Sequence, residues 1–183
     1  MRRCFWVNLK NEKYVSYHDF EWGKPTYDDV VLFEFLLLEC FQAGLSWEII
    51  LNKRDAFREA FDQFDYVKIS QYDEAEIARL MENPKIIRNR RKLEAACHNA
   101  RCFLAIQEEF GSFSAYIWSF TNHEIIVNQD GQLRTRSDLS DRVTIDLKKR
   151  GMKFLGTTTI YSYLQAIGVV NDHDLECDFR RIP

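Results

Sequence analysis

Apolar residues recur along this chain at intervals of three and four, the spacing that places side chains on one face of an α-helix. The clearest run extends from Ile86 to Phe110 and predicts one long amphipathic helix. The residues on its apolar face are Leu93, Ala96, Cys97, Ala100 and Leu104. Another run is almost continuously apolar, follows the acidic pair Asp28-Asp29 and extends to about Phe41. Because acids in the first turn favour a helix start, this run predicts a buried helix.

Capping residues and glycines divide much of the remaining chain into shorter helices. Ser46 is suited to cap a helix that continues through Phe57 to Phe61. Asp73 and Glu76 have the spacing of a capping box, and their helix is expected to end near Met81, before Asn83-Pro84. Further helices are expected over 113–120, from Asp138 or Ser140 to a left-handed end at Gly151, and from Thr157 to Ile167.

Two stretches lack a helical pattern: residues 1–25, which we expect to be irregular, and the polar loop 121–137. The chain has only 7 Gly and 3 Pro, which argues against a turn-rich β-sandwich. Its 183 residues are 46% hydrophobic, enough to bury a substantial core. The prediction is an all-α fold in one domain over residues 1–183, with a helical core at about 26–168.

Charge and hydropathy exclude several classes of protein. No apolar stretch approaches a membrane span and the N-terminus leads into no signal peptide, so we expect a cytoplasmic protein without a membrane partner. A net charge of −3 makes the whole chain a poor attractor of nucleic acid. Basic residues still cluster at Lys85, Arg88, Arg90, Arg91 and Lys92, and at Lys148, Lys149, Arg150 and Lys153. Such clusters are typical of solvated helix faces, but they also suit a surface that faces phosphates.

One carboxylate interrupts the apolar run that begins at Leu36. Glu39 would be costly to bury without a partner, and Gly44-Leu45-Ser46 then ends the helix just before Trp47. An acid in an apolar wall, beside a tight turn and an indole, suits a pocket for a flat, partly cationic ligand. The alternative is a core helix whose glutamate accepts a hydrogen bond from a nearby backbone amide. This segment alone leaves both open.

A second candidate site is the turn from Lys148 to Thr158, which joins two predicted helices. Gly151 and Gly156 allow close approach of the backbone, and the amides of the following helix would point outward toward a phosphate oxygen. Neighbouring lysines, including Lys153, would add charge-assisted contacts. Any helical hairpin has some of these features.

Cysteine and histidine cluster near both ends of the chain. The five cysteines, an odd number, indicate metal ligands or buried thiols rather than a disulfide framework. Cys4 and His18 precede the helical core, whereas His173 and Cys177 follow it. Two thiolates and two imidazoles would complete a tetrahedral Cys2His2 zinc site that joins the segments 1–25 and 169–183. The spacing is not that of a standard zinc finger.

Taken together, the motifs resemble one family over nearly the whole length. The chain is similar to the 3-methyladenine DNA glycosylase I family of the helix-hairpin-helix glycosylase superfamily. The matching segments are Arg3-Cys4-x-Trp6-Val7, Tyr17-His18-Asp19-x-Glu21-Trp22-Gly23, Leu38-Glu39-x-x-Gln42-Ala43-Gly44-Leu45-Ser46-Trp47, Ile87-Arg88-x-Arg90-x-Lys92, Trp118-Ser119-Phe120, Lys148-Lys149-Arg150-Gly151-x-Lys153-Phe154-x-Gly156-Thr157-Thr158 and Val170-Asn171-Asp172-His173-x-x-x-Cys177.

The resemblance implies a role for each group of residues. It implies structural zinc on Cys4, His18, His173 and Cys177, and a base pocket formed by Tyr14, Tyr17, Glu39 and Trp47, with Glu39 as the catalytic residue. It implies DNA contacts at Gly44, Leu45, Gly151, Lys153, Gly156 and Thr157, with Gly44-Leu45 near the gap left by a flipped nucleotide. Phe41 and the loop around Gly131 depart from the pattern expected of the family.

The function implied is hydrolytic excision of N3-methyladenine from alkylated double-stranded DNA by a monomer, with free 3-methyladenine as the product. Because Thr158 occupies the position where bifunctional relatives carry a Schiff-base lysine, the enzyme is expected to be monofunctional. Asp172 is the only acid near the usual position of a cation-stabilising aspartate, and no role is assigned to it. One alternative is a non-catalytic helix-hairpin-helix DNA-binding protein with structural zinc. A zinc hydrolase is disfavoured because four protein ligands leave no open position for water.

Overall fold

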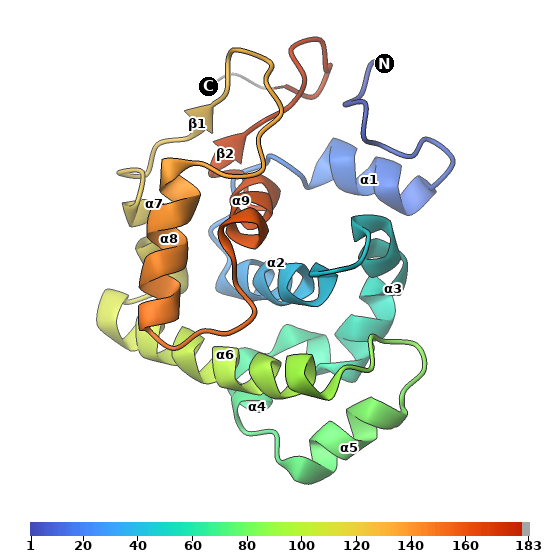
Figure 1. Ribbon diagram of the computed structural model, residues 1–183, viewed down its shortest axis with the longest axis vertical. Helices are drawn as coiled ribbons and strands as arrows, with labels where there is room; N and C mark the ends of the chain where they lie inside the picture. The colour runs from blue at the N-terminus through green and yellow to red at the C-terminus, as the bar shows by residue number, and fades with distance from the viewer. Residues whose placement is uncertain (181–183) are drawn as a thin grey trace.

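This computed structural model describes residues 1–180 of the chain, and the last three residues of the predicted C-terminal segment lie outside the described residues. The described part is mostly helical, as predicted (Figure 1). The helices are α1 Glu12–Phe20, α2 Asp29–Gln42, α3 Trp47–Ala60, α4 Tyr66–Ser70, α5 Glu74–Glu82, α6 Arg90–Phe110, α7 Phe113–Ser119, α8 Asp138–Lys149 and α9 Thr157–Ala166. A 3-10 turn covers Asp62–Phe64, and the short parallel strands β1 Ile126–Val127 and β2 Val170–Asn171 pair with each other.

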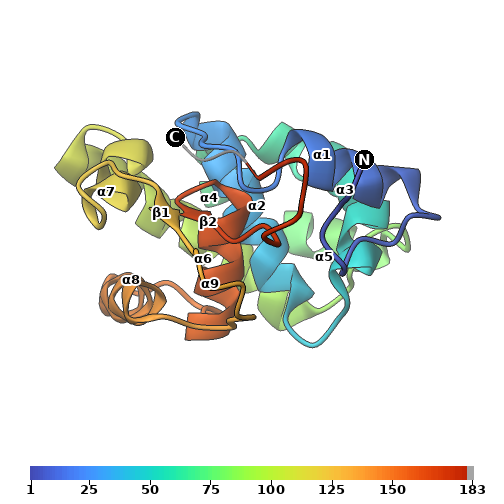
Figure 2. The same cartoon turned by 90° about the horizontal axis from the view of Figure 1, so that it is seen from above.

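The centre of the fold is α2, which α3, α6, α7 and α9 surround. Its residues from Leu32 to Phe41 are all buried, as the almost continuous apolar run predicts. Phe41, a departure from the family pattern, packs in the core with its ring centroid 4.8 Å from that of Phe57. In the view from above, α9 lies between α8 and α2 (Figure 2), and it packs against both.

Capping side chains set several helix boundaries; Ser46 and Asp73 were predicted as caps, whereas Asp28 was predicted as an acid of the first turn. The side chain of Asp28 accepts hydrogen bonds from the first-turn amides of α2, and Ser46 accepts one from Ile49 at the start of α3. Asp73 caps α5, but Glu76 pairs with Arg79 instead of completing a capping box. The helix predicted from Ile86 begins at Arg90, because Asn89 provides the cap.

The prediction that residues 1–25 are irregular was wrong over α1. Asn11 caps this helix by accepting from the amides of Lys13 and Tyr14. Its buried residues, Tyr17, His18 and Asp19, are consecutive, so no apolar stripe marks it in the sequence. Helix α4 and the strands were also not predicted, and the predicted polar loop 121–137 contains β1.

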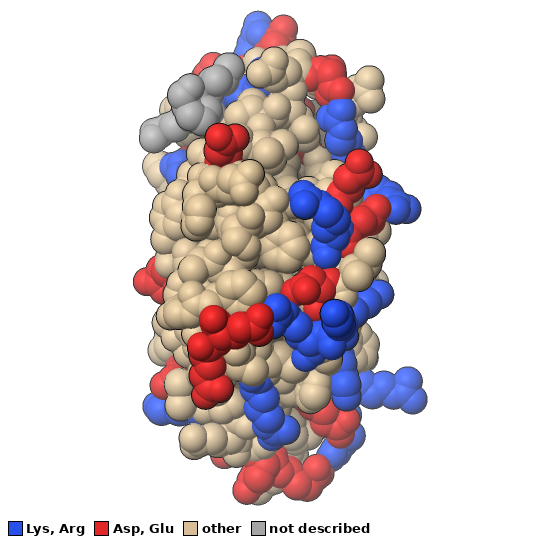
Figure 3. All heavy atoms as spheres, turned by 90° about the vertical axis from the view of Figure 1, so that its left-hand side faces the viewer, with Lys and Arg blue, Asp and Glu red and all other residues tan. Residues whose placement is uncertain are grey.

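The N-terminal segment and the segment after β2 lie at the same end of the molecule (Figure 1). They are joined by hydrogen bonds, including Arg2 N to Asp178 Oδ2 at 2.8 Å and Phe5 N to Asp174 Oδ2 at 2.8 Å. On the face drawn in Figure 3, basic and acidic side chains lie side by side, so that face presents no continuous basic surface. None of the described helices is long and apolar enough to cross a membrane.

Candidate active site

Glu39 lies on the central helix α2 and is 3% exposed. Among the described residues, no side chain or amide donates a hydrogen bond to its carboxyl group, so the alternative of a backbone-bonded core glutamate is wrong. Burial alone raises the pKa of Glu39 to about 8. Glu34, on the same helix and also buried, instead accepts hydrogen bonds from Arg54 and Arg58 at 2.7 and 2.8 Å. The fold therefore neutralises one buried acid with arginine and leaves the other without a partner.

Glu39 lines a cavity of about 290 Å³ together with the other predicted base-pocket residues, Tyr14, Tyr17 and Trp47. The ring centroids of Tyr17 and Trp47 are 5.4 Å apart. The buried Nε1–H of Trp47 has no hydrogen-bond acceptor among the described residues. Burial raises the pKa values of Tyr14 and Tyr17, so both phenols keep their protons at neutral pH. The cavity thus combines aromatic walls, an unpartnered donor and an unpartnered carboxyl group, which suits a flat ligand with polar edges.

Three elements bring these side chains together. Tyr14 and Tyr17 are three residues apart on α1 and therefore share a face of that helix. Trp47 is the first residue of α3, and its position follows from the Ser46 cap. The turn between α2 and α3 thereby places the indole in the wall of the cavity that Glu39 also lines.

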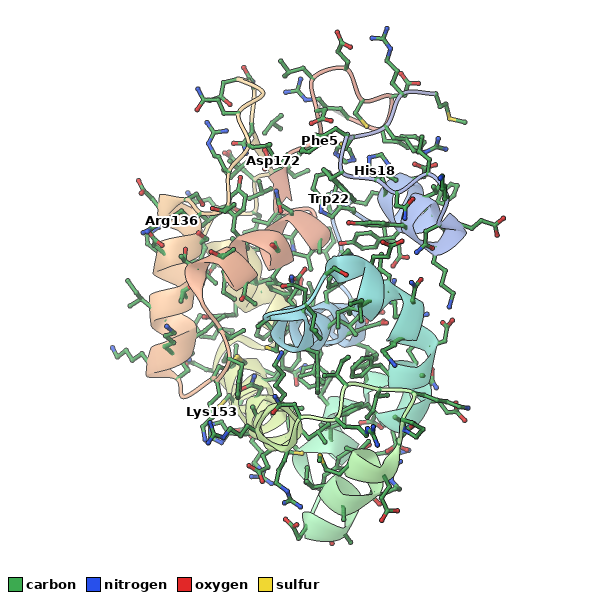
Figure 4. All side chains as sticks on the ribbon, turned by 45° about the vertical axis from the view of Figure 1, so that its right-hand side comes forward. Phe5, His18, Trp22, Arg136, Lys153 and Asp172 are labelled. Carbon is green, nitrogen blue, oxygen red and sulfur yellow. The ribbon has the colours of Figure 1, made fainter. Side chains whose placement is uncertain are left out.

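The structure adds cavity residues for which the sequence analysis proposed no role. They are Phe5, Trp6, Trp22, Gln42, Leu133, Arg134, Ser162, Gln165, Asp172 and Asp174. Phe5, Trp22 and Asp172 lie around the same region although they come from distant parts of the chain (Figure 4). Trp6 and Trp22 belong to the recognised motifs, and their indole centroids are 4.8 Å apart. Leu133 and Arg134 come from the loop around Gly131, whose sequence gave no signal.

Asp172 is held by three hydrogen bonds and lines the cavity. Its carboxylate accepts from the side-chain amides of Asn128 and Gln165, and from the Tyr161 hydroxyl at 3.0 Å. The sequence placed Asp172 next to the predicted metal ligand His173, but only the fold shows that it faces the same cavity as Glu39.

The four predicted metal ligands, Cys4, His18, His173 and Cys177, are buried together. Their ligand atoms all lie within 4.8 Å of one another, although they come from opposite ends of the described chain. The Nδ1 of His18 is 2.8 Å from Asp19 Oδ1, and the Nδ1 of His173 is 3.0 Å from Asn171 Oδ1. These partners direct both Nε2 atoms toward the cluster, as is usual for metal-bound histidines.

The chemistry of this cluster fits a metal ion. The buried Nε2 of His173 has no hydrogen-bond partner among the described residues. Burial lowers the pKa of His173 to about 4, so its imidazole is neutral and can bind a cation. Burial raises the pKa of Cys4, so only a bound cation would favour its thiolate form. Residues adjacent to the ligands, among them Phe5, Tyr17 and Asp172, line the cavity. The cluster therefore supports one wall of the candidate site.

The predicted DNA-contacting turn lies between α8 and α9. Gly151 has a φ of +95°, as the predicted left-handed helix end requires, and its carbonyl oxygen is 2.9 Å from His98 Nε2. Asn99 holds the backbone of Lys153 through both its N–H and its C=O, at 2.8 and 3.0 Å. The side chain of Lys153 is exposed and lies away from the cavity (Figure 4). Within residues 1–180, no side chain caps α9 at Gly156, so its first-turn amides, including that of Thr157, are available to an external acceptor.

The turn containing Gly44 and Leu45 projects from the end of α2. Gly44 is exposed with a φ of +85°. Lys92 stabilises this turn from inside, because its Nζ donates to the carbonyl oxygens of Phe41 and Ala43 at 2.8 and 2.7 Å. Lys92 is 8% exposed, so the solvated-face interpretation of its basic cluster is wrong for this residue. Lys85, Arg88, Arg90 and Arg91 are exposed.

Comparisons with known proteins agree with this geometry. Residues 6–181 match the family model described as methyladenine glycosylase. The chain is 46% identical over 178 residues to DNA-3-methyladenine glycosylase of Haemophilus influenzae, covering 96% of each protein. It is 44% identical over 180 residues to DNA-3-methyladenine glycosylase 1 of Escherichia coli, covering 97% of this chain and 96% of that protein.

Solved structures show the same fold. A tyrosine-to-phenylalanine variant of 3-methyladenine DNA glycosylase I in complex with 3-methyladenine superposes with a TM-score of 0.94 at 38% identity, covering 100% of this chain and 99% of the other. The Staphylococcus aureus 3-methyladenine DNA glycosylase I, solved for the structural basis of 3-methyladenine recognition, gives a TM-score of 0.92 at 39% identity, covering 96% and 95%. The chain belongs to the methyladenine glycosylase family.

Proposed function

We propose that this protein is a monofunctional DNA-3-methyladenine glycosylase, which flips N3-methyladenine out of alkylated double-stranded DNA and hydrolyses its N-glycosidic bond. The observation that carries the proposal is Glu39, a buried acid that lines an aromatic cavity and has no partner among the described residues. An unpaired carboxyl group in such a cavity is costly unless a ligand compensates for its burial. A base that carries a positive charge would do so, and neutral adenine would not.

The cavity residues would select the charged base by several interactions. Glu39 would accept hydrogen bonds from the base edge in its ionised form, which the positive charge of N3-methyladenine favours. Trp47 and the tyrosines would contact the faces of the ring, where cation–π attraction contributes about 1–2 kcal/mol in a desolvated site. The free Nε1–H of Trp47 would donate to an acceptor on the base. Extrusion from the helix costs a few kcal/mol, and less for a damaged base.

The bond to be broken is already weakened by the charge of the base. When the bond between the sugar C1′ and the base nitrogen breaks, its electron pair goes to the base, which leaves as neutral 3-methyladenine. The sugar passes through an oxocarbenium-like state, water adds to C1′, and a proton is released. Glu39 contributes by holding the cationic base in position before the bond breaks. The exposed Thr158 supplies no amine for a Schiff base, which supports the absence of lyase activity.

Binding to duplex DNA would use the two turns that the sequence indicates. Leu45, on the exposed turn after α2, is suited to fill the gap left by the extruded nucleotide, with Gly44 allowing close approach of the backbone. Lys153 and the backbone amides near Gly151, Gly156 and Thr157 are suited to phosphate oxygens. In this proposal, the hairpin formed by α8 and α9 is the helix-hairpin-helix element.

We further propose that Cys4, His18, His173 and Cys177 bind one structural Zn²⁺. Two cysteines and two histidines match the ligand preference and tetrahedral coordination of zinc. The metal would join the N-terminal and C-terminal segments and keep the adjacent cavity wall in place. The monomeric state and the cytoplasmic location stay predictions.

A base-release assay tests the function. Duplex DNA treated with a methylating agent is incubated with the protein, and the released bases are separated by chromatography. We expect free 3-methyladenine to accumulate without strand cleavage before alkaline treatment. The alternative, a non-catalytic DNA-binding protein, predicts that the duplex is bound and no base is released.

A further inference from the structure

The candidate cavity contains one feature that the selection of a cationic base does not explain. Among the described residues that line it, Arg134 is the only arginine or lysine, whereas Glu39, Asp172 and Asp174 supply carboxyl groups. Asp130 compensates the charge of this guanidinium, so Arg134 adds no attraction for a positively charged base, and the role of Glu39 does not explain it. Its presence is explained if an anion accompanies that ligand. Every nucleotide that leaves the helix carries such an anion, its own phosphate.

The hydrogen bonds of Arg134 leave one edge of the guanidinium free. Nη1 and Nη2 donate to the two carboxylate oxygens of Asp130, and Nη1 also lies 3.4 Å from the carbonyl oxygen of Gln132. No described residue accepts from Nε. The edge formed by Nε–H and the second N–H of Nη2 therefore has two parallel donors available, the arrangement that binds a phosphate through two hydrogen bonds. The side chain of Arg134 is 30% exposed, so that phosphate need not be buried.

The loop that carries Arg134 is anchored to the site. Asn128 donates to Asp172 and to the Tyr161 hydroxyl, and its carbonyl oxygen accepts from Arg180 Nη2 at 2.7 Å. At Gly131, an added Cβ would lie 3.1 Å from Leu175, so the loop packs closely against the segment after β2. Figure 1 shows these two segments at the same end of the molecule. The loop that carries the guanidinium is thus held beside the cavity that Arg134 lines.

We propose that Arg134 binds the phosphate of the flipped nucleotide at the entrance of the base cavity, through the donor edge that its pair with Asp130 leaves free. The inference rests on the proposed function and extends it. Asp130 orients the guanidinium, and the loop around Gly131 gains a role as the part of the protein that holds the displaced backbone. Arg134 thereby contributes to recognition of the extruded state rather than of intact duplex.

The test compares three binding measurements on Arg134→Ala. Duplex with a tetrahydrofuran abasic analogue represents the distorted backbone, the same duplex without it represents undamaged DNA, and free 3-methyladenine reports on the cavity alone. A lost charge-assisted contact predicts roughly tenfold weaker binding of the abasic-analogue duplex. Undamaged duplex should lose less than about threefold. Affinity for free 3-methyladenine should be unchanged, because the free base is neutral and carries no phosphate for Arg134 to bind.

Arg136→Ala is the matched control, because Arg136 belongs to the same loop, pairs with Asp141 and has a side chain that is 66% exposed. It removes an equal charge and should weaken both duplexes by the same small factor. Arg134→Lys keeps the charge without the two-donor edge and should fall between wild type and Arg134→Ala.

Equal losses of Arg134→Ala on the two duplexes, or no loss on either, would overturn the inference. Failure of the proposed function is a different result. In that case, wild-type protein releases no base from methylated DNA and does not bind free 3-methyladenine.

Discussion

Replacing Glu39 by Gln should stabilise the folded protein at alkaline pH, although it removes the residue proposed to read the base. The substitution keeps the size of the side chain and one acceptor oxygen. It removes a carboxyl group whose pKa is about 8 in the fold, because of burial, against an ordinary value of 4.5. The folded state therefore holds a proton that the unfolded state releases between these two pH values.

The sign of the effect follows from this difference. The contribution of Glu39 to the free energy of unfolding is fully present below about pH 4.5 and is lost progressively as the pH rises to about 8. Each pH unit of this interval corresponds to about 1.4 kcal/mol, so the total loss is on the order of a few kcal/mol. Glutamine does not titrate and avoids this loss. The free energy of unfolding of the variant should therefore increase relative to that of wild type as the pH rises from 5 to 8, by up to a few kcal/mol.

Urea unfolding of both proteins at pH 5, 6, 7 and 8 measures this gain. Glu34→Gln is the matched control, because Glu34 is on the same helix but is paired with Arg54 and Arg58. Breaking that buried network should destabilise the protein by about 3 kcal/mol. Destabilisation of Glu39→Gln to a similar extent at every pH would contradict this prediction, because it would show that Glu39 has a partner in the folded state.

The remaining predictions concern the metal and the DNA surface. Metal analysis of carefully purified, folded protein should find one zinc per chain, and only a trace of zinc in wild type would reject the site. Cys4→Ala should lose the zinc, whereas Cys97→Ala, which removes a buried thiol outside the cluster, should keep it. Lys153→Ala should weaken binding to all duplexes alike and reduce the salt dependence of the binding constant by about one counterion. Binding titrations at several salt concentrations measure this change, and a loss confined to one sequence context would contradict a phosphate contact.

The sequence predicts the central helices well because their signals are local. Asp28 and Ser46 are effective caps, and the continuous apolar run before Phe41 is what a helix buried on all sides requires. Helix α1 was missed because its buried residues are consecutive and its cap, Asn11, lies in an aromatic-rich segment. The strands have two residues each and depend on a pairing between distant segments, so no local pattern predicts them.

Some residues of the candidate site can likewise be predicted from the sequence, whereas others are brought to the cavity only by the fold. Glu39 stands out in the sequence because a charge within an apolar run violates the pattern around it, and the four Cys and His residues stand out by their chemistry. No pattern in the chain marks Arg134, and Asp172 is marked only by its place beside His173 in a recognised motif, which does not show that it faces the cavity. Only the packing of the loop around Gly131 against the segment after β2 brings them to the cavity. Local sequence carries no signal of such long-range contacts.

The most direct test of the role of Glu39 is a titration of free 3-methyladenine into wild-type and Glu39→Gln protein. A lost charge-assisted hydrogen bond is worth about 1.5–3 kcal/mol, which corresponds to roughly tenfold to a hundredfold. We predict that the variant binds the base more weakly and that its excision rate falls by this factor. Affinity for undamaged duplex and zinc content should be unchanged. Equal affinity of the two proteins for the base would show that Glu39 does not read it.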